Sequence, residues 1–350
     1  GTRRRDGAAR CYIGKVFNVV CRACKRAGMR VGRKVNRIVS GVVLMNKHTR
    51  VPAGLAGFLR IAVVWMLALC GLPTSAQDLA EIRESGVLRH LGVPYARFVG
   101  GSGEGFDVEL VQRFALHIGV RYEYVPAEWT GVIQDLIGQE LEYKPTMRAV
   151  GSRPIRGDII ANGLTILPPR QKVIDFSAPT FPSAVWLLAR ADFSVQPIKP
   201  SGDLQTDIKE TKKKLSLGKT YVMDNSCLDP RLYDIEGKGY PLHRFTKSAN
   251  LNDIVPAVVK GESKMSLLDV PDLIVAMEKW SGQIKVIGPI SEPQLMGAGF
   301  RKTSPALRQA FDEFLVGLQK DGTYMDLVKK YYRAAPRYHP EFFQKVSGGR

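Results

Sequence analysis

Residues 158–179 have the sequence DIIANGLTILPPRQKVIDFSAP, on which the prediction of the fold depends. The apolar run at 159–161 predicts a short buried strand, because it lacks the alternation of a half-exposed strand. Asn162 and Gly163 then predict a turn, or a point where the backbone lies close to a ligand. The two prolines at 168–169 predict a helix start, since proline suits the first helical position.

Arg170 comes directly after this expected helix start. A guanidinium near the free backbone N–H groups of a helix N-terminus can hold a carboxylate through two parallel hydrogen bonds. A lone arginine, however, is more often a solvated surface residue. The neighbouring residues in the sequence are therefore needed to distinguish a carboxylate-binding arginine from a solvated surface arginine.

These surroundings resemble the signature of the bacterial extracellular solute-binding proteins of family 3, which capture amino acids. In that signature a small-residue turn precedes a hydroxyl-x-x-x-x-Arg segment, and a D-F-S-x-P segment follows. Thr165, Arg170 and residues 175–179 match it in register, and the resemblance extends over most of residues 78–334. It implies that Arg170 binds the ligand carboxylate with help from Thr165. It also implies an α/β, two-lobed periplasmic binding protein-like (type II) fold with two crossover strands.

The same resemblance assigns further ligand contacts to two aromatic side chains, to the turn before the arginine, to a small polar turn of the second lobe and to one carboxylate: Tyr95, Trp129, Asn162, Gly163, Ser226, Cys227 and Asp269. The aromatic pair would flank the ligand side chain, and Asp269 would meet a ligand ammonium. Each aromatic residue is equally well explained as an ordinary core or rim residue. A catalytic role for Cys227 is disfavoured, because no nearby motif supplies a histidine base.

Three departures from the family pattern affect the ligand. Residues 225–227 read Asn-Ser-Cys where the family has a Gly-Thr turn. Gly92 stands where many amino-acid binders carry an aspartate that contacts the ammonium. Residues 139–157 predict an inserted hairpin, more typical of a surface loop than of a docking surface. These departures leave open a ligand other than a standard α-amino acid.

The helix expected after residue 105 carries an apolar stripe formed by Val111, Phe114, Ala115 and Ile118, which predicts a core-facing surface. The family opens this same helix with Gly-Phe-Asp. Asp107 is a plausible N-cap for it, because short acidic side chains accept hydrogen bonds from the first turn.

The net charge of +18 belongs mainly to the N-terminal segment. Residues 1–76 contain 15 Lys and Arg and one acid, whereas the remainder contains 36 Lys and Arg and 32 acids. The body of the chain lacks a basic stripe with interleaved aromatic residues, so nucleic-acid binding is disfavoured. Cys21 and Cys24 form a single C-x-x-C pair without a second pair, so no metal and no cofactor are predicted.

Residues 45–76 predict a signal peptide for export to the periplasm. A basic start is followed by an apolar run at 61–72 and by Thr74-Ser75-Ala76, which fits a cleavage site before Gln77. A lipoprotein anchored at Cys70 and a permanent membrane anchor are the lesser alternatives. Residues 1–44 are a basic extension that we interpret as sequence upstream of the true start. Lobe 1 is predicted to comprise residues 77–190 and 298–350, and lobe 2 residues 191–297.

The sequence therefore predicts a monomeric periplasmic receptor and not an enzyme. It would bind an amino acid or related carboxylate between its lobes and deliver it to the membrane permease of an ABC transporter, with the lobes closing by a hinge motion. The first alternative is a periplasmic enzyme similar to cyclohexadienyl dehydratase, which would need a general acid in the cleft. The second is a ligand-sensing or accessory protein for a membrane or periplasmic partner.

Overall fold

The computed structural model describes residues 78–348, except residues 102, 144–146 and 249. The predicted extension, signal peptide and Cys70 lie outside the described residues. Among the described residues, no helix combines the length and the hydropathy needed to cross a membrane.

The first sheet joins strands from both ends of the described chain. Its order is β2 (Arg121–Pro126), β1 (Val87–Gly92), β5 (Ile159–Ile160), β14 (Gly299–Phe300) and β6 (Asp175–Phe176). Strand β1 pairs in parallel with both β2 and the central strand β5, while β14 returns antiparallel between β5 and β6. Strand β5 is fully buried, as its apolar sequence predicts.

The second sheet is formed by the middle of the chain. Its order is β10 (Leu242–Arg244), β9 (Thr220–Val222), β11 (Met265–Asp269), β8 (Val185–Arg190) and β12 (Ile284–Pro289). Strand β11 is buried along its whole length and ends at Asp269. The carboxyl end of this strand therefore brings a carboxylate to the edge of the sheet.

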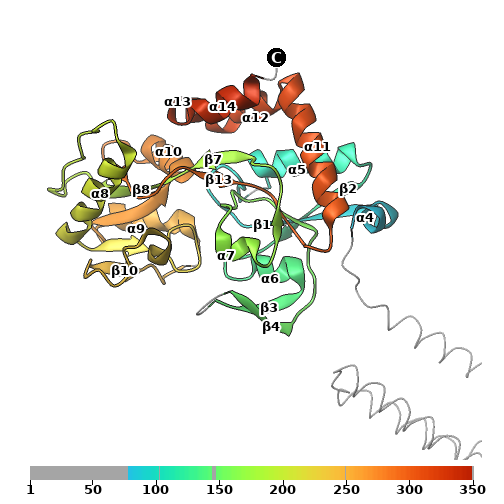
Figure 1. Ribbon diagram of the computed structural model, residues 1–350, viewed down its shortest axis with the longest axis horizontal. Coiled ribbons are helices and arrows are strands. Elements are labelled where there is room, and N and C mark those ends of the chain that lie inside the picture. The colour runs from blue at the N-terminus through green and yellow to red at the C-terminus, as the bar shows by residue number, and fades with distance from the viewer. Residues whose placement is uncertain (1–77, 102, 144–146, 249, 349–350) are drawn as a thin grey trace, which may run out of the picture. The chain divides into compact units, whose positions relative to one another are not determined.

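Two strands connect these sheets. Strands β7 (Phe181–Ser183) and β13 (Gln294–Met296) pair antiparallel, so one carries the chain out of the first sheet and the other brings it back. Figure 1 shows them between the part that holds β1 and the part that holds β8. The structure thus confirms the predicted two-lobed type II fold with two crossover strands.

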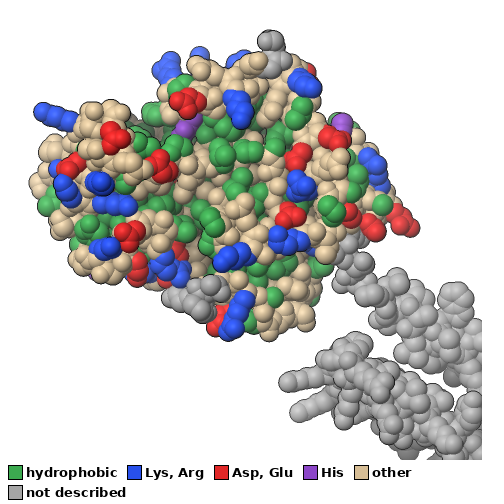
Figure 2. Space-filling view, viewed as in Figure 1, with side chains coloured by type: hydrophobic (Ala, Val, Ile, Leu, Met, Phe, Trp, Pro, Cys, Tyr) green, Lys and Arg blue, Asp and Glu red, His purple; other side chains and the backbone are tan. Residues whose placement is uncertain are grey.

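Helices cover both sheets and close the chain: α4 (Leu79–Ser85), α5 (Phe106–His117), α6 (Val132–Ile137), α7 (Pro168–Gln171), α8 (Leu204–Lys214), α9 (Ile254–Val259), α10 (Val270–Lys279), α11 (Pro305–Asp321), α12 (Thr323–Tyr332), α13 (Ala335–Tyr338) and α14 (Pro340–Ser347). Short 3-10 turns lie at Leu215–Leu217, Pro230–Tyr233 and Leu251–Asp253. The predicted apolar stripe of α5 is buried. On the face shown in Figure 2, acidic and basic side chains are interspersed, in keeping with the nearly balanced charge of the body.

The inserted hairpin consists of β3 (Gln139–Glu142) and β4 (Arg148–Ser152), which pair antiparallel. It follows α6 and precedes β5 along the chain, and Figure 1 shows it next to α6 at the lower end of the view. The sequence analysis gave this hairpin no part in the binding site.

Candidate functional site

Arg170 is a buried cation without an acidic partner in the described part of the chain. Its side chain is packed in the interior, and its Nη1 donates one hydrogen bond of 2.9 Å to the backbone oxygen of Thr165. No carboxylate of the described residues forms an ion pair with it. Burial lowers the pKa of Arg170, because the charged form of the side chain is less stable away from water. An anionic ligand would offset that cost, because an unpaired buried charge is strongly unfavourable.

The helix that carries Arg170 is short. Helix α7 spans four residues, and Leu167 at its N-cap gives no side-chain cap. The dipole of one helical turn adds little to anion binding, contrary to the expectation from sequence. Attraction for an anion therefore depends on the guanidinium itself.

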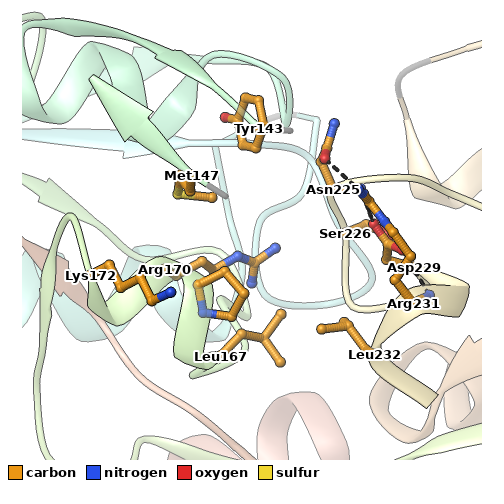
Figure 3. Close-up of a pocket in the computed structure, with 11 residues that line it drawn as sticks. Tyr143, Met147, Leu167, Arg170, Lys172, Asn225, Ser226, Asp229, Arg231 and Leu232 are labelled. Carbon is orange, nitrogen blue, oxygen red and sulfur yellow. Dashed lines mark hydrogen bonds and ion pairs between the residues drawn. The ribbon is translucent and has the colours of Figure 1, made fainter. Parts of the chain in front are cut away.

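Arg170 faces a cavity of about 260 Å³ whose walls come from both lobes. The first lobe contributes the two ends of the hairpin loop and helix α7, and the second contributes the turn after β9. The lining residues are Tyr143, Met147, Leu167, Pro169, Arg170, Lys172, Asn225, Ser226, Asp229, Arg231 and Leu232. In Figure 3 the Arg170 guanidinium points toward the segment that carries Ser226.

The charges that line this cavity leave it positive. Asp229 and Arg231 are paired with each other, and Asp229 also accepts a hydrogen bond of 2.8 Å from the backbone of Asn225. Burial alone would raise the pKa of Asp229, but these hydrogen bonds lower it below its ordinary value. Arg170 and Lys172 form no ion pair within the described part of the chain. The cavity therefore suits an anion.

The remaining predicted ligand residues form a buried cluster next to the cavity rather than lining it. Asp269 caps α10, accepting a hydrogen bond of 3.1 Å from the backbone of Asp272, and the Cys227 sulfur lies 3.7 Å from its Oδ2. Tyr95 also bonds to Asp269, and Thr165 bonds to Cys227. The structure thus brings five predicted residues from both lobes together, Arg170 included, but their mutual contacts fill the space.

Burial raises the pKa of the two carboxyl groups in this cluster, Asp269 and Asp272. Burial raises the pKa of Asp269 to about 6, although hydrogen bonds from Tyr95, the Asp272 backbone and Cys227 oppose the rise. Burial and the nearby charge of Asp269 hold the pKa of Asp272 well above the ordinary range. Burial also raises the pKa of the Cys227 thiol, so it is not an activated nucleophile.

Three further predicted residues lie at the first-lobe side of the cluster. Trp129 packs edge-on against Tyr95, with ring centroids 5.5 Å apart. Asn162 is fully buried, and neither atom of its side-chain amide has a partner among the described residues. Gly163 adopts φ 67°, and a Cβ there would lie 2.5 Å from the ring of Phe98. The turn therefore requires glycine.

The place of the missing aspartate is filled by an aromatic ring. A Cβ at Gly92 would lie 2.3 Å from Cε2 of Tyr124, whose hydroxyl donates a hydrogen bond of 3.1 Å to the Gly92 oxygen. An aspartate at this position would displace Tyr124. The ammonium site expected from the resemblance is thus incomplete on the first-lobe side.

The hairpin residues Tyr143 and Met147 were not predicted from sequence as cavity residues. Asp107 was expected as an N-cap, but its contact with the binding turn was not: its Oδ2 accepts a hydrogen bond of 2.6 Å from the backbone of Gly163. The only signal for the hairpin was its position between two segments expected at the cleft. Asp107 is separated from its partner by 56 residues, so no local pattern reveals their contact.

Known proteins are similar to this chain in sequence. The family described as "Bacterial extracellular solute-binding proteins, family 3" matches residues 137–334, more than half of the chain. The L-cystine-binding protein TcyJ of Escherichia coli (strain K12) is 25% identical over 268 residues, covering 73% of this chain and 86% of that protein.

Solved structures share the fold. A mutant of ArgBP from T. maritima aligns with a TM-score of 0.57 at 22% identity, covering 73% of this chain and all of that chain. The ancestral amino acid-binding protein AncCDT-1, described as a precursor of cyclohexadienyl dehydratase, aligns with a TM-score of 0.55 at 25% identity, covering 73% and 98%. The similar proteins therefore include binding proteins and a precursor of an enzyme.

Proposed function

The chain belongs to family 3 of the bacterial extracellular solute-binding proteins, and from this premise we propose that it captures a small carboxylate, an amino acid or a related acid, between its lobes. Capture would take place in the periplasm, and the loaded protein would deliver the solute to the permease of an ABC-type uptake system. The protein would act by binding, as a monomer, without a cofactor.

The observation that carries this proposal is the buried, unpaired guanidinium of Arg170 beside a cavity with walls from both lobes. A carboxylate there would receive charge-assisted hydrogen bonds in a desolvated site, which are stronger than neutral ones. TcyJ is described as a binder of cystine and ArgBP as a binder of arginine, which supports an amino acid or a similar acid as the ligand class.

The roles of the other predicted residues follow from their positions. We propose that Thr165 helps to position Arg170, because the Arg170 guanidinium donates a hydrogen bond to the Thr165 backbone oxygen. We assign Ser226 to the second-lobe wall of the cavity. Tyr95, Cys227 and Asp269 would contact a ligand only after the lobes separate, because their mutual contacts occupy the space between them.

We place the boundary between the lobes near residue 184, slightly before the predicted residue 190. Strand β8 (Val185–Arg190) pairs with β11 and β12 of the second sheet, so its residues move with the second lobe. Hinge motion would then fall on the segments around β7 and β13, which connect the sheets.

Substitution of Arg170 tests the proposal. The purified protein is titrated by calorimetry against amino acids, small carboxylates and cyclic acids, and Arg170→Ala should weaken binding of the true ligand at least about tenfold, which corresponds to about 1.4 kcal/mol. Arg121→Ala is the matched control, since Arg121 is exposed on β2 and forms an ion pair with the partly exposed Glu123. Affinity that is equal in both variants would disprove the assigned site.

A second candidate, turnover of a cyclohexadienyl carboxylate, is favoured by one observation. Asp269, with a pKa raised to about 6 by burial, is able to hold a proton near neutral pH as a general acid does. The alignment with AncCDT-1 is consistent with this chemistry. Incubation with prephenate or arogenate, followed by ultraviolet detection of an aromatic product, tests it. Activity that persists in Asp269→Asn would exclude Asp269 as the acid.

A further inference from the structure

The inserted hairpin supplies part of the cavity wall. Tyr143 comes directly after β3, and Met147 directly before β4. Both side chains are half-buried, pack against the core of the first lobe, and line the same cavity as Arg170. Figure 3 shows both of them on the side of the cavity away from Leu232. The insertion therefore faces the second lobe across the space that a ligand would occupy.

Tyr143 is held close to Arg170. Burial raises the pKa of Tyr143, while the Arg170 charge and a hydrogen bond with the Gln134 side chain lower it. Gln134 in turn accepts a hydrogen bond of 3.0 Å from the backbone of Leu141 and donates one of 2.8 Å to the Thr130 oxygen. Helix α6 thus fixes the hairpin end that bears Tyr143, so the aromatic ring is a positioned part of the wall.

Apart from the cation Lys172, the rest of the wall is mainly apolar. Leu167, Pro169 and Leu232 present carbon atoms to the cavity. The acidic residue that lines it, Asp229, is engaged by Arg231 and by the Asn225 backbone. Within the described part of the chain, a ligand in this cavity would thus meet two cations, Arg170 and Lys172, and apolar side chains, but no carboxylate without an ion pair.

With the lobes in contact, the two positions at which the resemblance would place the partner of an α-ammonium are closed to a ligand in this cavity. Asp269 does not line the cavity, and its oxygens are engaged by the Asp272 backbone, Cys227 and Tyr95. The place of the second carboxylate, at Gly92, is filled by the Tyr124 ring. Burying an ammonium without an acceptor is strongly unfavourable, so these closures select against free amino acids.

We propose that the cavity binds a carboxylate with an apolar or aromatic body and without an α-ammonium group, its body lying against Tyr143 and Met147. The carboxylate lies on Arg170, so this inference rests on the proposed function and narrows its ligand class. The hairpin is then the element that allows the site to bind the apolar body of the ligand.

The proposed ligand class can be tested with two pairs of compounds. The two members of each pair differ mainly in the presence of an α-ammonium group. Isothermal calorimetry with the full chain compares 3-phenylpropanoate with phenylalanine, and 4-methylpentanoate with leucine. In at least one pair the acid should bind at least about tenfold more tightly than the amino acid. Tighter binding of the amino acids, lost in Arg170→Ala, would overturn this inference and leave the proposed function standing. Absence of binding in both pairs would also overturn it, whereas the wider screen above decides the proposed function independently.

Substitutions in the hairpin test the apolar wall. Tyr143→Ala and Met147→Ala should each weaken the better acid at least about fivefold, because each removes buried contact area from the bound ligand. Val150→Ala is the control, since Val150 is exposed on β4 and does not line the cavity. Thermal unfolding of each variant without ligand checks that it is folded at the temperature of the titration, because both side chains also pack against the core of the first lobe. Unchanged affinity in both hairpin variants would overturn the assignment of the wall.

Discussion

Asp107 shows how one carboxylate can hold the turn that precedes the candidate site. Its Oδ2 accepts a hydrogen bond of 2.6 Å from the backbone of Gly163, joining the first turn of α5 to the segment after β5. Burial raises the pKa of Asp107 to about 7, although the Gly163 bond opposes the rise. The side chain therefore changes its charge within the physiological pH range.

This carboxylate predicts a pH dependence of stability. The pKa of Asp107 in the folded protein, about 7, lies above its ordinary value of 3.8, so acid favours folding. The contribution of Asp107 to the free energy of unfolding should thus decrease as the pH rises from about 4.5 to about 7.5, whereas buried His90, whose pKa is lowered to about 4, contributes with the opposite sign. In Asp107→Asn the decrease should be smaller, because asparagine carries no charge but can still accept the Gly163 hydrogen bond. Urea denaturation at several pH values measures the free energy of unfolding of both proteins.

A control variant and the other buried acids determine how the pH dependence of the Asp107→Asn variant is interpreted. Asp326→Asn changes an exposed residue of α12 and should leave the slope as in the parent. Asp269 and Asp272 have raised pKa values as well, so some slope should remain in Asp107→Asn. Identical slopes for Asp107→Asn and the parent would contradict the assignment.

The prediction from sequence was wrong about the part that Asp107 plays. The helix begins at Phe106 with Gly105 as its N-cap, and Asp107 reaches Gly163 instead of capping its own helix. An acidic residue near a helix start is a valid capping signal, but a tertiary partner can take its side chain. A local sequence pattern does not reveal a partner that is distant along the chain.

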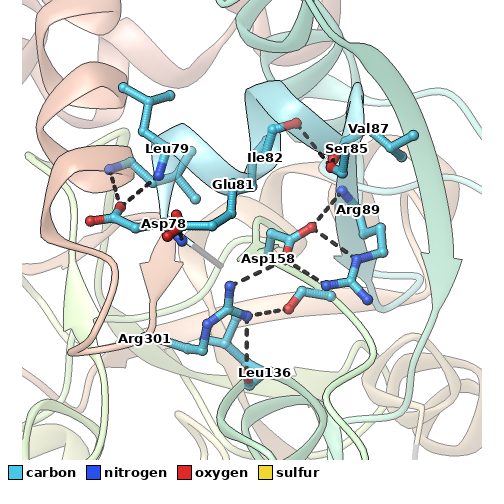
Figure 4. A network of polar contacts seen from close by, with 12 residues as sticks. Asp78, Leu79, Glu81, Ile82, Ser85, Val87, Arg89, Leu136, Asp158 and Arg301 are labelled. Carbon is cyan, nitrogen blue, oxygen red and sulfur yellow. Dashed lines mark hydrogen bonds and ion pairs between the residues drawn. The ribbon is translucent and has the colours of Figure 1, made fainter. Parts of the chain in front are cut away.

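At the scale of elements, a buried ion network fixes three strands of the first sheet (Figure 4). Asp158, directly before β5, accepts hydrogen bonds of 3.0 Å from the backbone and Nε of Arg89 on β1. Arg301, directly after β14, donates from Nη2 to Asp158 over 3.1 Å and from Nη1 to the Leu136 oxygen over 3.3 Å. The network therefore joins the C-terminal return strand to the strands that precede the binding turn.

Removal of the central carboxylate should destabilise the fold. Asp158→Ala leaves buried Arg301 without its anion, and breaking a buried pair in this way costs about 3–5 kcal/mol. Asp175→Ala is the control, because its ion pair with Lys302 is partly exposed and should contribute about 0–1 kcal/mol. Chemical denaturation measures both values. Equal losses in the two variants would show that the network is not a determinant of stability.

Elements with a strong local pattern were predictable from sequence. The buried strand β5 and the apolar face of α5 follow from runs and spacings of apolar residues, which depend on neighbours along the chain. The partner of Asp158 was not predictable, since Arg301 lies 143 residues away. The hairpin strands β3 and β4 were expected, but the direction of their end residues into the cavity depends on the packing of α6 against the sheet.

At the scale of the whole molecule, the two lobes are in contact at the candidate site. The resemblance to family 3 implied a site with residues from both lobes, but it could not show that Tyr95, Thr165, Cys227 and Asp269 contact one another. Sequence patterns specify which residues line an interlobe surface, whereas the distance between the lobes is set by a hinge with more than one arrangement. Ligand access to these residues therefore requires opening.

Cys227 offers a direct measure of that opening. It is buried between Asp269 of its own lobe and Thr165 of the other lobe, and burial raises the pKa of its thiol. Alkylation should therefore be slow and should require separation of the lobes. A ligand that binds both lobes should slow it at least about tenfold at a concentration of 100 times its Kd, because closed molecules then predominate.

Peptide mass spectrometry can follow alkylation at Cys227 separately from the cysteines of residues 1–76. Full labelling in denaturant establishes that the thiol is reactive once exposed. In Arg170→Ala the same ligand concentration should protect less, because the guanidinium is the expected source of affinity in the first lobe. If a bound ligand left the alkylation rate unchanged, the ligand would not be closing the lobes over Cys227, and the hinge mechanism would have to be abandoned even if Arg170 still proved to bind the solute.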